Sequence, residues 1–276
     1  MEIKKHLPLL GLGGLLILLV GIIGILDNGN TLDFSQGVGS KEGECNVSGI
    51  TLYGILTTYT NSNINSEEDG EELAQTSSDY IQDRIEQGEN DKAIKAIVLE
   101  IDSWGGHPVA GEEVANALKR AQKPTVALIR GTGTSAAYWA ATGADSIYAS
   151  QNSDVGGIGV SMSYLGNAEK NSKEGLTYYE VASAPFKDYG NPDKPLTTEE
   201  RELFLRDIQV VHDNFVGAVA ENRNLDINKV KVLADGSSTP GQMALANGLI
   251  DKIGGIYEVV EYLEEKTGEA VNICWQ

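Results

Sequence analysis

The sequence predicts an α/β fold, in which buried parallel strands alternate with helices. Residues 94–101 and 124–130 are almost continuously apolar, which is typical of strands that are covered on both faces. A segment with helical spacing follows each of them, over residues 110–121 and from Ser135 onward. The 276 residues are enough for one domain of about 200 residues with additional terminal segments. Alternation of this kind defines a layered α/β domain.

The N-terminal segment is apolar enough to cross a membrane. Residues 7–26 contain no charged residue, and a helix over them would be about 30 Å long, the thickness of a bilayer core. We therefore expect a tail at residues 1–6, a transmembrane anchor at 7–26, a polar stalk at 27–48 and a folded domain at 49–276. A cleaved signal peptide is the alternative, although the segment does not end in a small-x-small cleavage site.

The charge distribution predicts the orientation and excludes one class of partner. Lys4 and Lys5 precede the apolar segment, so the positive-inside rule places the N-terminus in the cytoplasm and the folded domain outside the cell membrane. The chain carries a formal net charge of −19, which nucleic-acid phosphates would repel. We therefore expect no nucleic-acid partner.

Within the domain, each expected element has its own local signal. The first half contains apolar strands, and helices whose apolar residues recur at helical spacing. A helix at residues 71–86 is expected to bury Leu73, Tyr80, Ile81 and Ile85. In chain order we expect strands at 49–57, 94–101, 124–130, 146–149, 158–164 and 177–182, and helices at 71–86, 110–121, from 135, and at 168–173.

The C-terminal third is predicted to be helical. Thr197 and Glu200 have the spacing of a capping box, which marks the start of a helix. An apolar stripe follows at helical spacing, formed by Phe204, Ile208, Val211, Phe215 and Val219. Thr239 and Pro240 open a further helix, and a last one at residues 257–266 ends before Gly268.

The chain has two cysteines, Cys45 and Cys274. They are too far apart in the sequence for a local metal-binding motif, and nothing else indicates a metal or a cofactor. A disulfide in an oxidising compartment and two free thiols are both compatible with their positions.

Ser135 is the strongest candidate for a catalytic residue. It lies between the apolar strand at residues 124–130 and a helix rich in small residues. Small neighbours let a substrate approach the hydroxyl, and the start of a helix favours negative charge that develops beside it. This position suits a nucleophilic serine.

A serine nucleophile needs a base that takes its proton. Beyond the apolar segment the histidines are His107 and His212, and no aspartate is obviously placed to orient His107, so a Ser-His-Asp triad has weak support. A lysine is the other base available, provided that burial or a nearby positive charge lowers its pKa. Lys187 stands out because it follows the end of the predicted strand at residues 177–182, behind apolar residues, whereas most lysines lie in polar helices.

A glycine pair provides the third catalytic feature. Gly105 and Gly106 follow the buried strand at residues 94–101, and the backbone N–H groups of such a turn can form an oxyanion hole. On its own a Gly-Gly turn is weak evidence, since it is more often only a tight turn.

Together these segments resemble the signal peptide peptidase A (SppA) family of serine-lysine peptidases, which has the Clp protease/crotonase fold of repeated ββα units with a helical C-terminal part. The resemblance covers about residues 49–265 and rests on several motifs in the same order. The motifs are Ile97-Val-Leu-Glu-Ile-Asp-Ser-Trp-Gly-Gly106, Gly133-Thr-Ser-Ala-Ala-Tyr-Trp139, Gly156-Gly-Ile-Gly-Val160, Ser183-Ala-Pro-Phe-Lys-Asp188 and Gly241-Gln-Met-Ala-Leu-Ala-Asn-Gly-Leu-Ile-Asp251.

The resemblance implies a function and a site. It implies that Ser135 is the nucleophile, that Lys187 is the general base, and that N–H groups of Gly105 or Gly106 and of Ala136 form the oxyanion hole. The implied substrates are signal peptides and other hydrophobic or unfolded peptides near the membrane. The implied assembly is a homo-oligomer, here an octamer, in which neighbouring subunits share the serine and the lysine.

The sequence departs from the family pattern at four points. Trp104 replaces the proline of Ser-Pro-Gly-Gly, and alanines at 136 and 137 replace a Gly-Gly pair. Gly157 stands where the family usually has a serine that hydrogen-bonds the lysine, so Ser161 or a water would have to orient Lys187 instead. The chain also has one family domain instead of a tandem pair.

Two other functions remain compatible with the sequence. A crotonase-type enzyme would use the same fold and Gly-Gly turn to act on acyl-CoA, with a carboxylate as its acid or base. A non-catalytic scaffold would keep the fold without turnover, which the glycine at position 157 favours.

Overall fold

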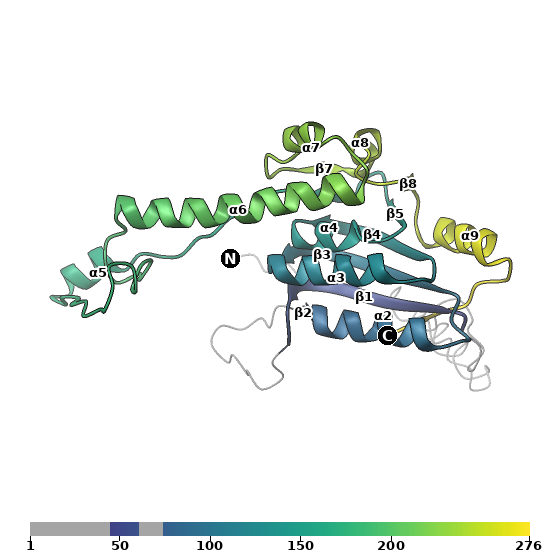
Figure 1. Ribbon diagram of the computed structural model, residues 1–276, viewed down its shortest axis with the longest axis horizontal. Coiled ribbons are helices and arrows are strands. Elements are labelled where there is room, and N and C mark those ends of the chain that lie inside the picture. Colours follow the sequence, from purple (N-terminus) through teal and green to yellow (C-terminus); the bar gives the residue numbers. More distant parts are fainter. Residues whose placement is uncertain (1–44, 61–73) are drawn as a thin grey trace, which may run out of the picture. The chain divides into compact units, whose positions relative to one another are not determined.

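A sheet with almost entirely parallel strands forms the centre of the domain (Figure 1). The structure, a computed structural model, describes residues 45–60 and 74–276. Within these residues the nine-stranded sheet has the order β2-β1-β3-β4-β5-β8, with β9 beside β1 and β6 beside both β4 and β7. The strands are β1 (Val47–Thr57), β2 (Gln75–Ser77), β3 (Ala96–Gly106), β4 (Thr125–Thr134), β5 (Ser146–Ala149), β6 (Asp154–Gly156), β7 (Ser238–Pro240), β8 (Lys252–Ile253) and β9 (Ile273–Trp275). The predicted α/β fold class is confirmed.

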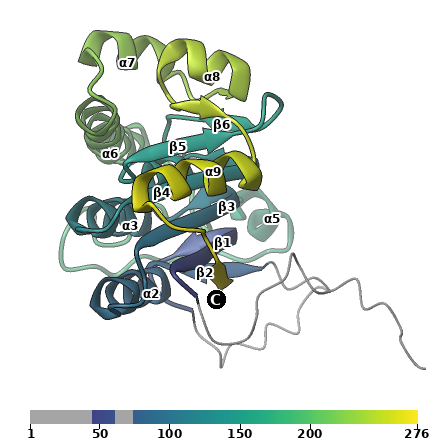
Figure 2. The same cartoon turned by 90° about the vertical axis from the view of Figure 1, so that its right-hand side faces the viewer.

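Helices cover both faces of this sheet (Figure 2). Alternate residues of β3 point to opposite faces of the sheet. Ile97 and Leu99 belong to the larger core, which also contains residues of α2, α3, α4 and the C-terminal part of α6. Val98 belongs to the smaller core, beneath α9. The described helices are α2 (Ser78–Asn90), α3 (Pro108–Arg120), α4 (Ala136–Ala141), α5 (Ala168–Lys173), α6 (Thr198–Asn222), α7 (Ile227–Leu233), α8 (Gly241–Asn247) and α9 (Ile256–Thr267). Burial on both faces explains the continuously apolar strands.

Most helices and strands with a strong local sequence pattern are present where the sequence predicts them. The strands predicted at residues 94–101, 124–130 and 146–149 correspond to β3, β4 and β5. The capping box is present, since the Thr197 hydroxyl accepts from the Glu200 N–H at 3.2 Å and the Glu200 carboxylate accepts from the Thr197 N–H at 3.1 Å. These elements depend on near neighbours in the chain, which is why the sequence predicts them well.

Two predicted strands are wrong. Residues 158–164 and 177–182 are irregular and pair with no strand among the described residues. Residues 161–166 and 174–187 are exposed. A strand needs a neighbour for its N–H and C=O groups, and apolar composition without that neighbour does not produce one.

Two predicted helices begin later than expected. The helix predicted from residue 71 begins at Ser78, because the Ser77 hydroxyl caps it by accepting from the Tyr80 N–H at 3.2 Å. Of its expected inner face, Ile81 and Ile85 are buried, Tyr80 is partly buried, and residue 73 lies outside the described residues. The helix expected after Thr239 begins at Gly241 as α8.

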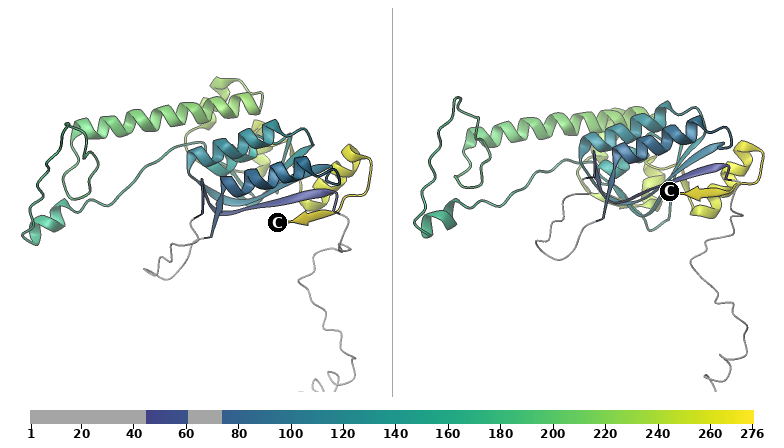
Figure 3. Two further views of the ribbon diagram at one scale, coloured as in Figure 1. Left: turned by 60° about the horizontal axis from the view of Figure 1, so that its bottom comes forward. Right: turned by 90° about the horizontal axis from the view of Figure 1, so that it is seen from below.

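The apolar stripe of α6 is buried only in its second half. Phe215 and Val219 are buried in the larger core, whereas Phe204, Ile208 and Val211 are only partly buried. The first half of α6, together with α5 and the loop between them, extends beyond the sheet (Figure 3). We call residues 160–211 the arm of the domain.

The membrane prediction falls outside the part of the chain that is described. The expected tail, anchor and most of the stalk lie within residues 1–44. Among residues 45–60 and 74–276, no helix combines the length and the apolar character that a membrane span requires.

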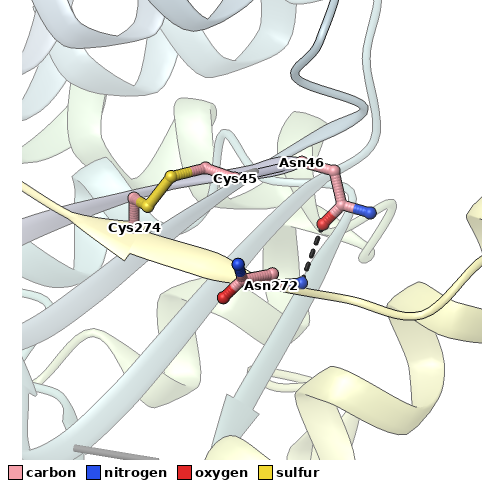
Figure 4. Close-up of a disulfide and its surroundings, with 4 residues drawn as sticks. All are labelled: Cys45, Asn46, Asn272 and Cys274. Carbon is pink, nitrogen blue, oxygen red and sulfur yellow. Dashed lines mark hydrogen bonds between the residues drawn. A yellow bond between two sulfur atoms is a disulfide. The ribbon is translucent and has the colours of Figure 1, made fainter. Parts of the chain in front are cut away.

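A disulfide joins the two ends of the described domain (Figure 4). Cys45 and Cys274 are bonded, with Cα atoms 5.7 Å apart and a sequence separation of 229 residues. Beside the bond, the Asn272 N–H donates to the Asn46 side-chain oxygen at 2.7 Å. The bond links β9 to β1. In the parallel pairing of these two strands, Ser48 lies opposite Cys274. Of the two states that the sequence allowed, the structure has the bonded one.

We expect Cys274→Ser to lower the free energy of unfolding by about 2–5 kcal/mol, since a cross-link over a long loop restricts the unfolded chain. Urea unfolding of the oxidised wild type and of the variant measures this change. The wild type under reducing conditions is the control and should resemble the variant. Equal midpoints for all three samples would contradict a stabilising bond.

Candidate active site

Ser135 occupies a strained turn between β4 and α4. Its backbone has φ 54° and ψ −130°, and Asn224 is the other non-glycine residue with positive φ in the described chain. Such a conformation costs about 1–3 kcal/mol and persists only where the surroundings hold it. The Ser135 N–H donates to the Gly156 carbonyl at 2.8 Å, and its carbonyl accepts from the Trp139 N–H at 2.9 Å.

The turn presents the Ser135 side chain at the surface of an otherwise buried segment. From Thr132 to Ala144, Ser135 is the one residue that is not buried. Its hydroxyl does not cap α4, although serine is a preferred capping residue. The backbone of Ser135 is therefore held in place, and its hydroxyl remains available.

Two glycines approach Ser135, one at the end of β3 and one directly after β6. A Cβ atom added to Gly105 would lie 2.7 Å from the Ser135 Cβ and 3.0 Å from the Ala136 nitrogen. A Cβ atom added to Gly157 would lie 3.4 Å from the Ser135 nitrogen and 3.1 Å from the Thr134 Cβ. The Gly-Gly turn of β3 and the end of β6 thus converge on the serine, as a compact catalytic site requires.

The two amide groups nearest Ser135 differ in their partners. The Gly105 N–H donates to the Ser103 hydroxyl at 3.1 Å, so it already has an acceptor within its own turn. Ala136 is the first residue of α4, and a first-turn N–H has no acceptor within its helix. Of these two predicted oxyanion donors, the Ala136 N–H therefore has no acceptor within its helix, whereas the Gly105 N–H has one within its turn.

Helix α4 is anchored by its two aromatic residues. Trp139 stacks on Phe215 of α6 with ring centroids 4.8 Å apart. The Tyr138 hydroxyl donates to the Leu249 carbonyl at 2.8 Å, and burial raises the pKa of Tyr138, so it stays protonated at neutral pH. These contacts hold the helix, and with it the turn at Ser135, against the core.

Lys187 lies in a different part of the chain. It belongs to an exposed turn in the loop between α5 and α6, at the N-terminal end of α6. At about 1.5 Å per residue, that end lies about 25 Å along the helix from Phe215, which contacts α4. No hydrogen bond or ion pair joins Lys187 to another described side chain. The fold of one chain does not bring the predicted base to Ser135.

The predicted orienting residue is also separate from Lys187. Ser161 is exposed in the irregular segment that follows β6, and no hydrogen bond connects it with Lys187. The position that the family pattern assigns to an orienting serine, Gly157, lies instead against Ser135.

Neither histidine of the described residues is a partner of Ser135. His107 precedes α3, and its backbone N–H donates to the Leu56 carbonyl at 2.8 Å. The His212 Nε2 atom lies 3.1 Å from the Ala234 carbonyl. Neither side chain hydrogen-bonds to Ser135 in the described structure, so a triad on this serine has no support.

The sequence did not predict one cluster of charged side chains near Lys187. Lys194, in the same loop as Lys187, forms ion pairs with Glu180, Asp188 and Glu200. The hydrogen bond to Glu180 raises the pKa of Lys194 above its ordinary value, so this amine stays protonated and is unsuited to act as a base. The capping box at Glu200 was visible in the sequence, but the lysine partner was not.

Comparisons with known proteins identify the family of this chain. The profile described as peptidase family S49 matches residues 117–269, which include Ser135 and Lys187. A protein of Enterococcus faecium assigned as a signal peptide peptidase SppA is 33% identical over 181 residues, which cover 64% of this chain and 53% of that protein. A protein of Methanocaldococcus jannaschii assigned as a protease is 34% identical over 179 residues, which cover 64% of this chain and 58% of that protein.

The chain therefore spans little more than half the length of these curated relatives. Among solved structures, a mutant ClpP1 from Listeria monocytogenes aligns with a TM-score of 0.46 and 13% identity, over 75% of this chain and 91% of that one. The S49 profile matches more than half of the chain and includes the turn with Ser135 and the loop with Lys187. This chain belongs to peptidase family S49.

Proposed function

We propose that this chain is a serine endopeptidase, with Ser135 as its nucleophile and Lys187 as its general base. The observation that carries the proposal is the turn at Ser135, where strained backbone exposes a single hydroxyl in a buried segment. Membership of a peptidase family supports the reaction class. Lys187 is favoured because its amine has no ion pair in the described structure, unlike Lys194 in the same loop.

The reaction would proceed in two proton-coupled steps. The neutral Lys187 amine takes the Ser135 proton as the serine oxygen attacks the peptide carbonyl. N–H groups of Ala136 and Gly106 stabilise the oxyanion, and the lysine passes its proton to the departing amine. The amine then activates a water molecule, which hydrolyses the acyl-enzyme and regenerates both residues.

The serine and the lysine would come from neighbouring subunits of a homo-oligomer, with an octamer as the proposed size. The distance along α6 between the lysine loop and the contact with α4 favours this arrangement over a site within one chain. Ile208 and Val211 of the stripe on the arm are only partly buried, and a second copy could cover them, whereas Phe204 packs against Tyr164 and Tyr189 of its own chain.

We further propose that residues 7–26 anchor the chain in the cell membrane, with the domain on the extracytoplasmic side. The uncharged segment and the preceding lysines support this topology. The Cys45–Cys274 bond also favours it, since structural disulfides persist mainly in oxidising compartments. Recovery of the full chain in the soluble fraction after cell lysis would contradict the anchor.

Substrates would be signal peptides and other hydrophobic or unfolded peptides near the membrane. We expect the full chain in detergent to hydrolyse casein and a synthetic signal peptide. Binding of acyl-CoA esters without peptide hydrolysis, measured by calorimetry, would favour a crotonase-type enzyme. A folded oligomer that neither hydrolyses these peptides nor binds CoA esters would favour a non-catalytic scaffold.

A further inference from the structure

A group of charged side chains holds the loop that carries Lys187. The Lys194 ammonium lies 2.8 Å from the Glu180 carboxylate, 3.0 Å from that of Glu200 and 3.6 Å from that of Asp188. The side chain of Lys194 is only 16% exposed, and that of Glu200 only 5%. One ammonium group thus joins the segment after α5, the turn at Asp188 and the first turn of α6.

Asp188 is the residue directly after Lys187, and both of its carboxylate oxygens accept hydrogen bonds. The Tyr178 hydroxyl donates to one oxygen at 2.5 Å, and the Asn191 side chain donates to the other at 3.1 Å. The hydrogen bond from Tyr178 lowers the pKa of Asp188, so the carboxylate stays ionised. The same carboxylate lies 3.6 Å from the Lys194 ammonium, and its side chain is only partly exposed.

This arrangement has two consequences for Lys187. The backbone of the turn is fixed through Asp188, while the neighbouring Lys187 side chain extends into solvent without an ion pair in the described structure. The Asp188 carboxylate already contacts Tyr178, Asn191 and Lys194, and it forms no ion pair with Lys187 in the described structure. Such a pair would favour the protonated amine, which cannot act as a base.

We propose that Lys194 is a positioning residue for the Lys187 amine and acts through Asp188. This inference rests on the proposed function, in which Lys187 is the general base. Lys194 does not touch the substrate. It keeps the turn in the geometry that delivers Lys187, and it keeps the adjacent carboxylate from capturing the amine.

The test uses the full chain in detergent and a fluorogenic hydrophobic peptide. Lys194→Met removes the charge while keeping the length and most of the volume of the side chain. We expect kcat to fall about 10²-fold, the effect of displacing a catalytic group by about 1 Å, with KM changed by less than about twofold. Labelling of Ser135 by a fluorophosphonate should slow in parallel, because it needs the same base.

Lys173→Met is the matched control. Lys173 lies in α5 of the same arm, and its contact with Glu169 is 4.0 Å long and exposed, so the variant makes the same charge change without breaking a buried network. We expect wild-type kcat and KM from it. Lys194→Arg should restore much of the lost kcat, because it returns the positive charge.

Several results would overturn the proposal. They are an unchanged kcat in Lys194→Met, an equal loss in Lys173→Met, or a raised KM with unchanged kcat. If Lys194→Met does not fold, Glu180→Gln weakens the same network, and an unchanged kcat in that folded variant is equally decisive. Failure of the proposed function is a separate outcome, in which Lys187→Ala itself retains full activity.

Discussion

Ser135→Ala is expected to abolish peptide hydrolysis, with kcat falling by at least about 10⁴-fold, as for other serine enzymes that lose their nucleophile. The substitution removes the oxygen that would form the acyl-enzyme. It should leave the fold intact, because the Ser135 hydroxyl does not cap α4 and its backbone bonds to Gly156 and Trp139 do not involve the side chain. Hydrolysis of casein by the full chain measures the effect.

The matched control for this variant is Ser172→Ala. Ser172 is exposed in α5, and its side chain has no hydrogen bond in the described structure. It should retain wild-type activity. Unfolding midpoints of both variants should match the wild type. Substantial hydrolysis by a pure, folded Ser135→Ala protein would place the nucleophile elsewhere.

Lys187→Ala is expected to be as inactive as Ser135→Ala when each is made alone. The two inactive chains should nevertheless complement each other when they are co-expressed. If each site takes its serine from one subunit and its lysine from the next, random assembly gives about one quarter of the sites both groups, and activity should recover to about that fraction. Within a single chain, α6 separates the loop of Lys187 from Ser135, which is why complementation is expected.

Complementation also distinguishes the two possible origins of the dyad. No recovery in a co-assembled oligomer would mean that each site is built within one subunit. Lys173→Ala, which removes an exposed ammonium from the same arm, should be active alone and serves as the control for a nonspecific charge effect. Full activity of Lys187→Ala by itself would exclude this lysine as the base.

The site was only partly predictable from the sequence. The position of Ser135 between a strand and a helix was predicted because β4 and α4 form from adjacent residues with clear apolar patterns. The contact of Gly157 with this turn was not, since it depends on the pairing of β6 with β4. The two wrong strands, at residues 158–164 and 177–182, have apolar residues but no neighbouring strand in the described chain.

The sequence by itself determined the α/β alternation, the capped start of α6, the order of the family motifs and the candidate pair of Ser135 and Lys187. The alternation and the capped start depend on residues close together in the chain, where the period of apolar residues and the capping chemistry act directly, whereas the candidate pair depends mainly on the family motifs. Only the tertiary structure decided that Gly105 meets Ser135, that Cys45 is bonded to Cys274, and that Lys194 rather than Lys187 is held by carboxylates. Those contacts join residues whose approach is set by strand order and by the packing of helices on the sheet, which no local pattern encodes.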